Sequence, residues 1–149
     1  MSYFGFFCNF AVQCMDKFRK LIGIFPTGVL SGLTLALILW LTLVPHPVGK
    51  VDLPLFPGAD KVAHAVMFGF LTLVILTELM KYKGWMSLSL PLIGLVSLLC
   101  AVFGIVVEVV QEAMGLGRTF ETLDILADSA GAVIAGAIWA ALQNNIAKT

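Results

Sequence analysis

The stretch LSLPLIGLVSLLCAVFGIVVEV, residues 88–109, contains one charged side chain, that of Glu108. At about 1.5 Å per residue, a helix of this length reaches roughly 33 Å, which is enough to cross a hydrocarbon core of about 30 Å. Backbone groups inside a bilayer must be paired within the chain, and a helix pairs nearly all of its own. The stretch therefore predicts a transmembrane helix with one carboxyl group near its end.

Three further apolar segments have the same character. Residues 28–44 carry no charge, and residues 62–79 and 123–142 are also largely apolar. Together they predict one membrane domain over residues 26–149. The expected fold is an all-α integral membrane protein, a four-transmembrane-helix bundle with spans at about 28–44, 62–79, 88–109 and 123–142.

Residues 1–25 have an amphipathic pattern rather than a spanning one. Apolar residues recur at helical spacing from Phe7 to Phe25, and polar residues such as Gln13 and Lys17 fall between them. A helix of this kind lies in the plane of the membrane surface. We therefore expect an N-terminal amphipathic interfacial helix ahead of the first span.

The composition agrees with a membrane protein. The 149 residues are 60% hydrophobic, with nine basic and nine acidic side chains and a mean hydropathy of +1.01. An average soluble domain is nearer to about 45–50% apolar and about 25% charged. The net charge is zero and there is no basic run, so nothing indicates a nucleic-acid partner. The three cysteines show neither a disulfide framework nor a C-x-x-C metal motif.

Basic residues lie mainly on one side of the predicted membrane. Six of the nine fall before the first span, between the second and third, or after the fourth. Short cytoplasmic loops carry an excess of Lys and Arg. Both termini are therefore expected to face the cytoplasm, and most of the acids then lie toward the outer face.

Polar side chains from three spans meet at this outer face. The second span begins there, the third ends there and the fourth begins there, carrying the motifs DKVAH, EVVQE and RTFETLDILADSAG. Residues four apart share a helix face, as Asp60 and His64 do, and as Asp124 and Asp128 do. We predict a polar binding cluster of Asp60, Lys61, His64, Glu108, Gln111, Arg118, Asp124 and Asp128.

Structural roles would also account for some of these charges. Charged side chains inside a span usually turn inward and pair. Glu108 and Asp128 could therefore form a salt-bridge lock with Lys61 or Arg118. Asp124 could instead complement the positive end of the fourth helix.

His64 allows a catalytic interpretation of the same cluster. With carboxylates nearby, it is a candidate base oriented by Asp60, or a ligand of a divalent metal. The chain has no nucleophile elbow, no H-E-x-x-H motif and no phosphate loop. The sequence therefore leaves enzymatic activity open and assigns no catalytic residue, metal or other cofactor.

The order of these motifs resembles the VanZ-like membrane proteins of bacteria. DKVAH opens the second helix, E-V-V-Q closes the third, and G-R precedes Asp124 and A-D-S-A-G-A, so the similarity covers about residues 40–142. The founding member of that family is associated with resistance to the glycopeptide antibiotic teicoplanin. Asp128 departs from the family, which usually has Asn there. The family's polar signature falls on Asp60, Lys61, His64, Glu108, Gln111, Arg118 and Asp124.

The resemblance implies a multi-pass protein of the bacterial cytoplasmic (inner) membrane, with the lipid bilayer as its surroundings. Its outer site would bind or modify a cell-envelope component or a glycopeptide antibiotic, with a role in teicoplanin-type resistance. Lys61 and Arg118 would then hold an anionic group of the ligand. One alternative is a membrane-embedded hydrolase or transferase that acts on a lipid-linked substrate through His64 and carboxylates. The other is a structural scaffold whose polar network only locks the helices.

Overall fold

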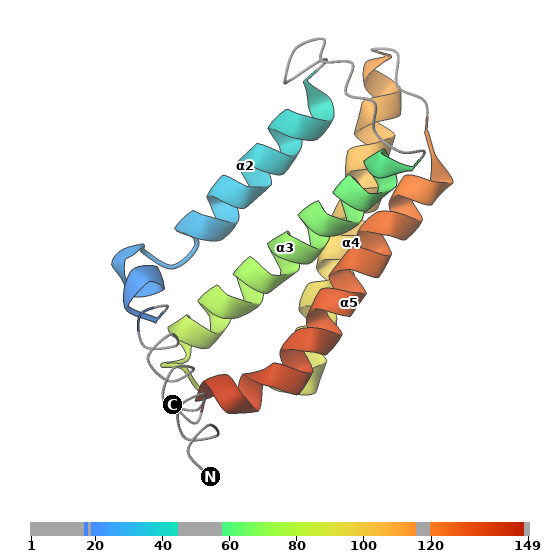
Figure 1. Ribbon diagram of the computed structural model, residues 1–149. Helices are drawn as coiled ribbons and strands as arrows, with labels where there is room; N and C mark the ends of the chain where they lie inside the picture. The colour runs from blue at the N-terminus through green and yellow to red at the C-terminus, as the bar shows by residue number, and fades with distance from the viewer. Residues whose placement is uncertain (1–16, 18, 45–57, 116–119, 148–149) are drawn as a thin grey trace.

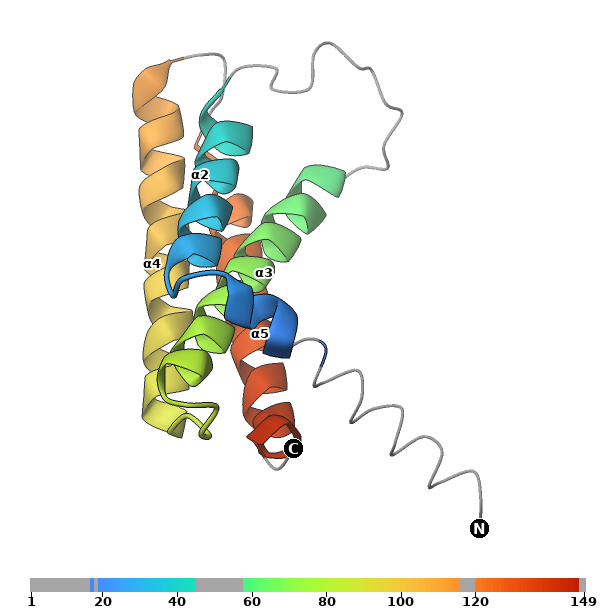
Figure 2. The same cartoon turned by 90° about the vertical axis from the view of Figure 1, so that its left-hand side faces the viewer.

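The structure, a computed structural model, describes residues 17, 19–44, 58–115 and 120–147. These residues form helices joined by turns, with no strand among them, so the all-α prediction is confirmed. Consecutive long helices run in opposite directions and lie side by side (Figures 1 and 2). Their bounds are α2, Val29–Leu43; α3, Ala59–Tyr82; α4, Leu90–Met114; and α5, Thr122–Ala147.

Three of the described helices are long and apolar enough to cross a membrane. They are α3, with 24 residues, α4, with 25, and the 22-residue part of α5 that ends at Gln143. The remaining apolar helix, α2, has 15 residues. At about 1.5 Å per residue it reaches roughly 22 Å, less than a hydrocarbon core of about 30 Å. The chain is thus a multi-pass membrane protein, while the fourth crossing and the cytoplasmic termini stay predictions.

Each long helix presents large apolar side chains on the outside of the bundle. Leu33 of α2, Val66 of α3, Leu98 of α4 and Ile134 of α5 are 59–64% exposed. An apolar surface of this extent is unfavourable in water, and it suits contact with lipid chains.

The hydroxyl groups inside the bundle are paired within their own helices. Each donates to the carbonyl oxygen four residues earlier, at 2.7–3.1 Å. A buried hydroxyl without a partner costs free energy, and the carbonyl one turn back is the nearest acceptor in a helix. The apolar interior therefore tolerates these side chains, which are Thr34, Thr42, Thr72, Thr77 and Ser97.

Glycines bring α3 and α5 together, and these two helices make the most extensive contact in the bundle. A Cβ atom added at Gly69 would lie 3.1 Å from the carbonyl oxygen of Gly131, and one added at Gly131 would overlap the backbone of Ala65. Small residues allow two backbones to approach this closely. The contact fixes how α5 faces α3, and therefore which side chains of the two helices meet.

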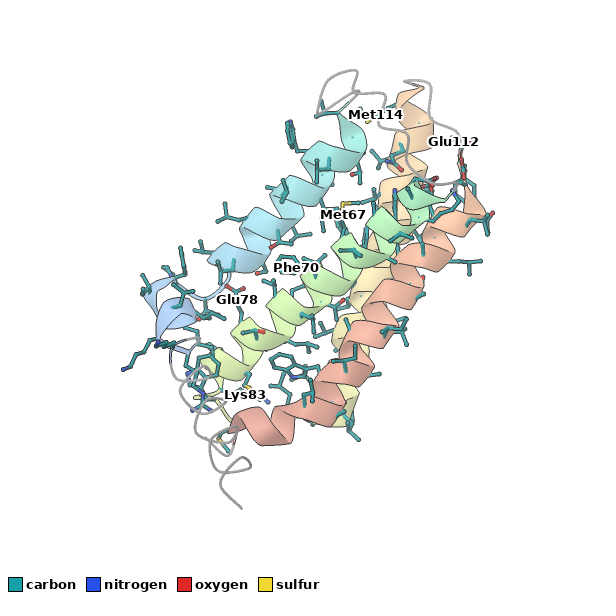
Figure 3. All side chains as sticks on the ribbon, in the orientation of Figure 1. Met67, Phe70, Glu78, Lys83, Glu112 and Met114 are labelled. Atoms are coloured by element: carbon teal, nitrogen blue, oxygen red, sulfur yellow. The ribbon has the colours of Figure 1, made fainter. Side chains whose placement is uncertain are left out.

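Glu78 of α3 holds the start of α2 (Figure 3). Its carboxylate accepts backbone N–H groups from Leu30 at 3.1 Å and Ser31 at 3.3 Å, and the Ser31 hydroxyl at 2.6 Å. The first amides of a helix lack partners within the helix and attract negative charge. Glu78 is buried for this reason, and it fixes α2 against α3.

Residues 19–24 form a short helical segment before α2. They belong to the predicted interfacial helix, whose residues 1–16 lie outside the described residues. Placement of this helix on the membrane surface stays a prediction.

Candidate functional site

The polar residues lie at the end of the bundle where α3 and α5 begin and α4 ends (Figure 1). We call it the acidic end. α3 starts at Ala59 rather than at residue 62, the predicted start of the span. Asp60 and Lys61 are therefore in the first turn of the helix, where the motif DKVAH was expected to open it. The described acids at this end are Asp60, Glu108, Glu112, Glu121, Asp124 and Asp128.

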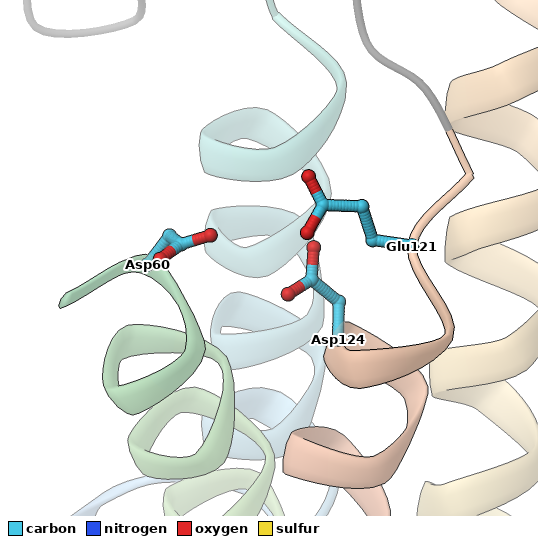
Figure 4. A group of neighbouring side chains, drawn as sticks. All are labelled: Asp60, Glu121 and Asp124. Carbon is cyan, nitrogen blue, oxygen red and sulfur yellow. The ribbon is translucent and has the colours of Figure 1, made fainter. Parts of the chain in front are cut away.

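Three carboxylates surround the ammonium group of Lys61. Lys61 Nζ lies 2.7 Å from Asp60, 2.6 Å from Glu121 and 3.0 Å from Asp124. Figure 4 shows the three acids converging from the start of α3 and from the start of α5 with the segment before it. Asp124 is the most buried of them, with 13% of its side chain exposed. We call these three acids the carboxylate ring.

A buried histidine–aspartate pair lies one turn deeper. His64 Nδ1 is 3.0 Å from Asp128 Oδ1, and both residues are buried, Asp128 completely. Asp60, the partner expected for His64 from their spacing, contacts Lys61 instead. When Nδ1 carries the proton and donates it to Asp128, Nε2 is left as the acceptor.

A glycine on α4 makes room for Asp128. A Cβ atom added at Gly104 would lie 2.7 Å from Asp128 Oδ2 and 2.8 Å from Asp128 Cβ. Real Cβ atoms do not approach other atoms so closely, because the interior is close-packed. Asp128 is thus held between His64 of α3 and the bare backbone of α4.

Glu108 connects α4 to the segment that leads into α5. It is 2% exposed, and its Oε1 accepts the backbone N–H of Glu121 at 2.7 Å. Its other oxygen, Oε2, and Asp128 Oδ2 are buried and have no hydrogen-bond partner among the described residues. Buried acceptors are usually paired, so these two oxygens are exceptions that the described residues do not satisfy.

One predicted residue, Gln111, has a different role, and another, Arg118, is not described. Gln111 donates from Nε2 to the backbone oxygen of Thr42 at 2.8 Å, so it fastens α4 to the end of α2. Arg118 lies outside the described residues, and its expected role as counter-charge is untested.

Glu121 is a site residue that the predicted cluster omits. It lies before the first turn of α5, where an acid needs no partner in the protein. Its position three residues before Asp124 was an available signal, because residues at this spacing share a helix face. There was no comparable signal in the sequence for the backbone carbonyl of Thr42, which accepts the hydrogen bond from Gln111, because every residue has a backbone carbonyl.

The carboxylate ring is also the metal-capable group among the described residues. One oxygen from each of Asp60, Glu121 and Asp124 lies within 4.8 Å of the others. Hard divalent cations prefer such oxygen ligands. The Lys61 ammonium already lies among these oxygens, and His64 is directed to Asp128, so a metal here would have to replace the ammonium.

The fold and this site define a class: a helical, multi-pass membrane protein with buried carboxyl groups gathered at one end of its bundle. The chain belongs to the VanZ/LLP1 family, whose family model matches residues 2–143. No curated protein and no solved structure matched it. The family match covers α2, α3, α4 and α5 up to residue 143, so the predicted VanZ-like membership is confirmed.

Proposed function

We propose that this VanZ/LLP1 protein binds a cell-envelope component at the acidic end and recognises a protonated amine of that component. The observation that carries the proposal is the carboxylate ring around Lys61 Nζ, with distances of 2.6–3.0 Å. The site accommodates one ammonium group already. The carboxylates of Asp60 and Glu121, 57% and 48% exposed, offer acceptors for another.

An amine fits this end better than the anionic group expected from the sequence. The Lys61 ammonium is engaged by three carboxylates, so an anion that approached it would also meet those acids. Besides Lys61 and His64, the charged side chains described at this end are acids. Such an excess attracts cations and stabilises them through charge-assisted hydrogen bonds.

The distribution of basic residues supports a ligand from the cell envelope. With the termini in the cytoplasm, as the basic residues predict, the acidic end faces the outside. Peptide stems of cell-wall precursors carry amines, and so do glycopeptide antibiotics. We propose a lipid-linked cell-wall precursor as the ligand. A role in teicoplanin-type resistance would follow if the bound precursor were shielded from the antibiotic.

Binding to the purified protein tests the proposal. The full chain is placed in lipid nanodiscs and titrated with a lipid-linked cell-wall precursor that has a free amine on its peptide stem. The same precursor with its amine acetylated is the comparison. We expect at least about tenfold weaker binding after acetylation, since a hydrogen bond to a charged group contributes about 1.5–3 kcal/mol. Equal affinity for the two ligands would refute recognition of the amine.

A pair of variants locates the site. Asp124→Asn removes one charge from the carboxylate ring, and we expect it to weaken binding of the free-amine precursor by about tenfold or more. Glu112→Gln is the matched control, because Glu112 is an exposed acid at the same end and outside the ring. Equal losses in the two variants would point to a diffuse charge effect rather than a site.

Susceptibility to teicoplanin provides a cellular test. We expect bacteria that produce the protein to tolerate a higher concentration of the antibiotic than bacteria that produce Asp124→Asn at the same level. Equal susceptibility of the two strains, with binding of the precursor intact in nanodiscs, would remove resistance from the proposal and leave precursor binding standing.

The buried His64–Asp128 pair supports a second candidate, a hydrolase or transferase acting on a lipid-linked substrate. An imidazole fixed at Nδ1 by a carboxylate can act as a base through Nε2. Incubating the precursor with wild type and with His64→Ala, followed by mass spectrometry, separates the candidates. A new product that needs His64 would favour the enzyme, and an unchanged precursor would favour binding.

A further inference from the structure

An apolar groove lies near the opposite end of the bundle, among the short segment 19–24, α2, α3 and α5. Its volume is about 380 Å³. Phe70, one of the residues that line it, is 57% exposed, so the groove opens to the outside of the bundle, toward lipid (Figure 3). Its apolar lining comes mainly from Ile22, Leu30, Phe70, Leu73, Val74 and Trp139.

The hydroxyl groups in the lining need no hydrogen bond from a ligand. The hydroxyl groups of Thr34 and Thr77, which also line the groove, donate to carbonyl oxygens of their own helices at 2.8 and 2.7 Å. Trp139 is 6% exposed, and its indole N–H has no partner among the described residues. The groove therefore presents an apolar surface whose hydroxyl groups are already paired, which suits a hydrocarbon chain.

The distance from Lys81, beyond the end of the groove, to its far end fits one leaflet of a bilayer. On α3 the lining runs from Phe70 to Thr77, and Lys81 follows one turn later, about 16 Å from Phe70 at roughly 1.5 Å per residue. Half of a hydrocarbon core of about 30 Å is of the same order. A chain in the groove would therefore extend from the end of the bundle to about mid-membrane.

Lysines accompany two segments that line the groove, the short segment 19–24 and the end of α3. Lys81 donates to the backbone oxygen of Ile22, a lining residue, at 3.1 Å. Lys17 and Lys20 precede Ile22 in the sequence, and Lys83 follows Lys81; all three are exposed. Basic side chains beside a groove between transmembrane helices are typical of sites for anionic lipid headgroups.

The acid described at this end does not cancel that charge. Glu78 is buried, and both of its oxygens accept hydrogen bonds from the start of α2. The exposed lysines are therefore available to a phosphate group at the membrane surface.

We infer that the groove binds one acyl chain of an anionic phospholipid, whose phosphate group contacts Lys17, Lys20 and Lys83. The site lies at the end of the bundle opposite to the carboxylate ring and shares no residue with it. This inference therefore stands or falls separately from the proposed function.

Native mass spectrometry of the purified full chain tests the inference. The protein in detergent is titrated with phosphatidylglycerol or with phosphatidylcholine that has the same acyl chains. We expect the anionic lipid to bind more tightly. Each of Lys20→Gln and Lys83→Gln should weaken its binding by about fivefold, since a lysine at an anionic membrane surface contributes about 1 kcal/mol. Equal binding of the two lipids would overturn the inference.

The acyl chain is tested by filling the groove. Val74→Trp places an indole among the lining residues, and we expect it to reduce binding of phosphatidylglycerol at least about fivefold, because it excludes methylene groups whose burial contributes about fourfold each. The matched control is Val66→Trp, on the same helix at a position that is 64% exposed, and it should bind as wild type does. Leu30→Trp replaces Val74→Trp if circular dichroism shows that the latter is misfolded. Equal binding by the groove variant and the control would overturn the inference.

Discussion

Replacing Asp128 by asparagine distinguishes a ligand site from a structural lock. Asp128 is completely buried, contacts His64 Nδ1 at 3.0 Å and has a second oxygen without a partner among the described residues. Asparagine has nearly the same shape, and its amide oxygen can accept the same hydrogen bond. Asp128→Ala is the comparison, because it removes the partner of a buried imidazole altogether.

The two variants should differ in how much they change the free energy of unfolding. In Asp128→Asn the hydrogen bond to His64 is kept and an incompletely paired carboxyl group is removed, so the free energy of unfolding should change by less than about 1 kcal/mol. In Asp128→Ala the imidazole loses its partner, and an unsatisfied buried polar group costs about 1–3 kcal/mol. Binding of the free-amine precursor should fall in both variants, since both remove the carboxylate.

Two measurements on the same samples check this prediction. Unfolding by titration with sodium dodecyl sulfate gives the free energy of unfolding, and titration with the precursor gives the dissociation constant. A loss of about 3–5 kcal/mol in Asp128→Asn would refute the reasoning, because it is the cost of breaking a buried ion pair. That result, together with unchanged precursor binding, would favour the structural scaffold.

Three further predictions concern packing, capping and the carboxylate ring. Gly131→Ala should lower the free energy of unfolding by about 1–3 kcal/mol or more through overlap with α3, whereas Gly94→Ala, which meets nothing within 4 Å, should be neutral or stabilising in the same unfolding titration. Glu78→Gln should weaken the start of α2 by up to about 2 kcal/mol and speed hydrogen exchange of its first amides, and unchanged exchange would contradict the capping role. Lys61→Met should increase the affinity for Ca²⁺ in calorimetric titrations, because it leaves three carboxylates without their ammonium. A Lys61→Met protein that binds Ca²⁺ no better than wild type would show that the ring cannot act as a cation site.

The helical fold could be predicted from the sequence because each apolar segment carries its own signal. Residues 88–109 are long enough and apolar enough to identify a span without knowledge of its neighbours, and α4 covers Leu90–Met114. The apolar span of α3 was placed from residue 62, because Asp60 and Lys61 are charged, whereas the helix itself begins at Ala59. Their mutual contact and the contacts of Lys61 with Glu121 and Asp124 depend on where that helix begins.

The pairing within the site could not be predicted from spacing. Asp60 and His64 share a face of α3, yet the partner of His64 comes from α5. That choice depends on the rotation of α5 about its axis, which is fixed where Gly131 meets Ala65. Spacing within one helix specifies a face and gives no information about the helix opposite. Glu121 was omitted from the predicted cluster for a different reason, since an acid just before a helix can simply be solvated, although its spacing from Asp124 was an available signal.

The central claim is that the carboxylate ring binds an amine of a cell-envelope component, and a thermodynamic cycle tests it most directly. Affinities are measured for wild type and Asp124→Asn, each with the free-amine and the acetylated lipid-linked precursor. If Asp124 contacts the amine, the losses of binding free energy caused by Asp124→Asn and by acetylation should not add. We predict a coupling free energy of about 1–3 kcal/mol between the two changes. Losses that add to within about 0.5 kcal/mol would contradict the claim, because they would mean that carboxylate and amine act independently.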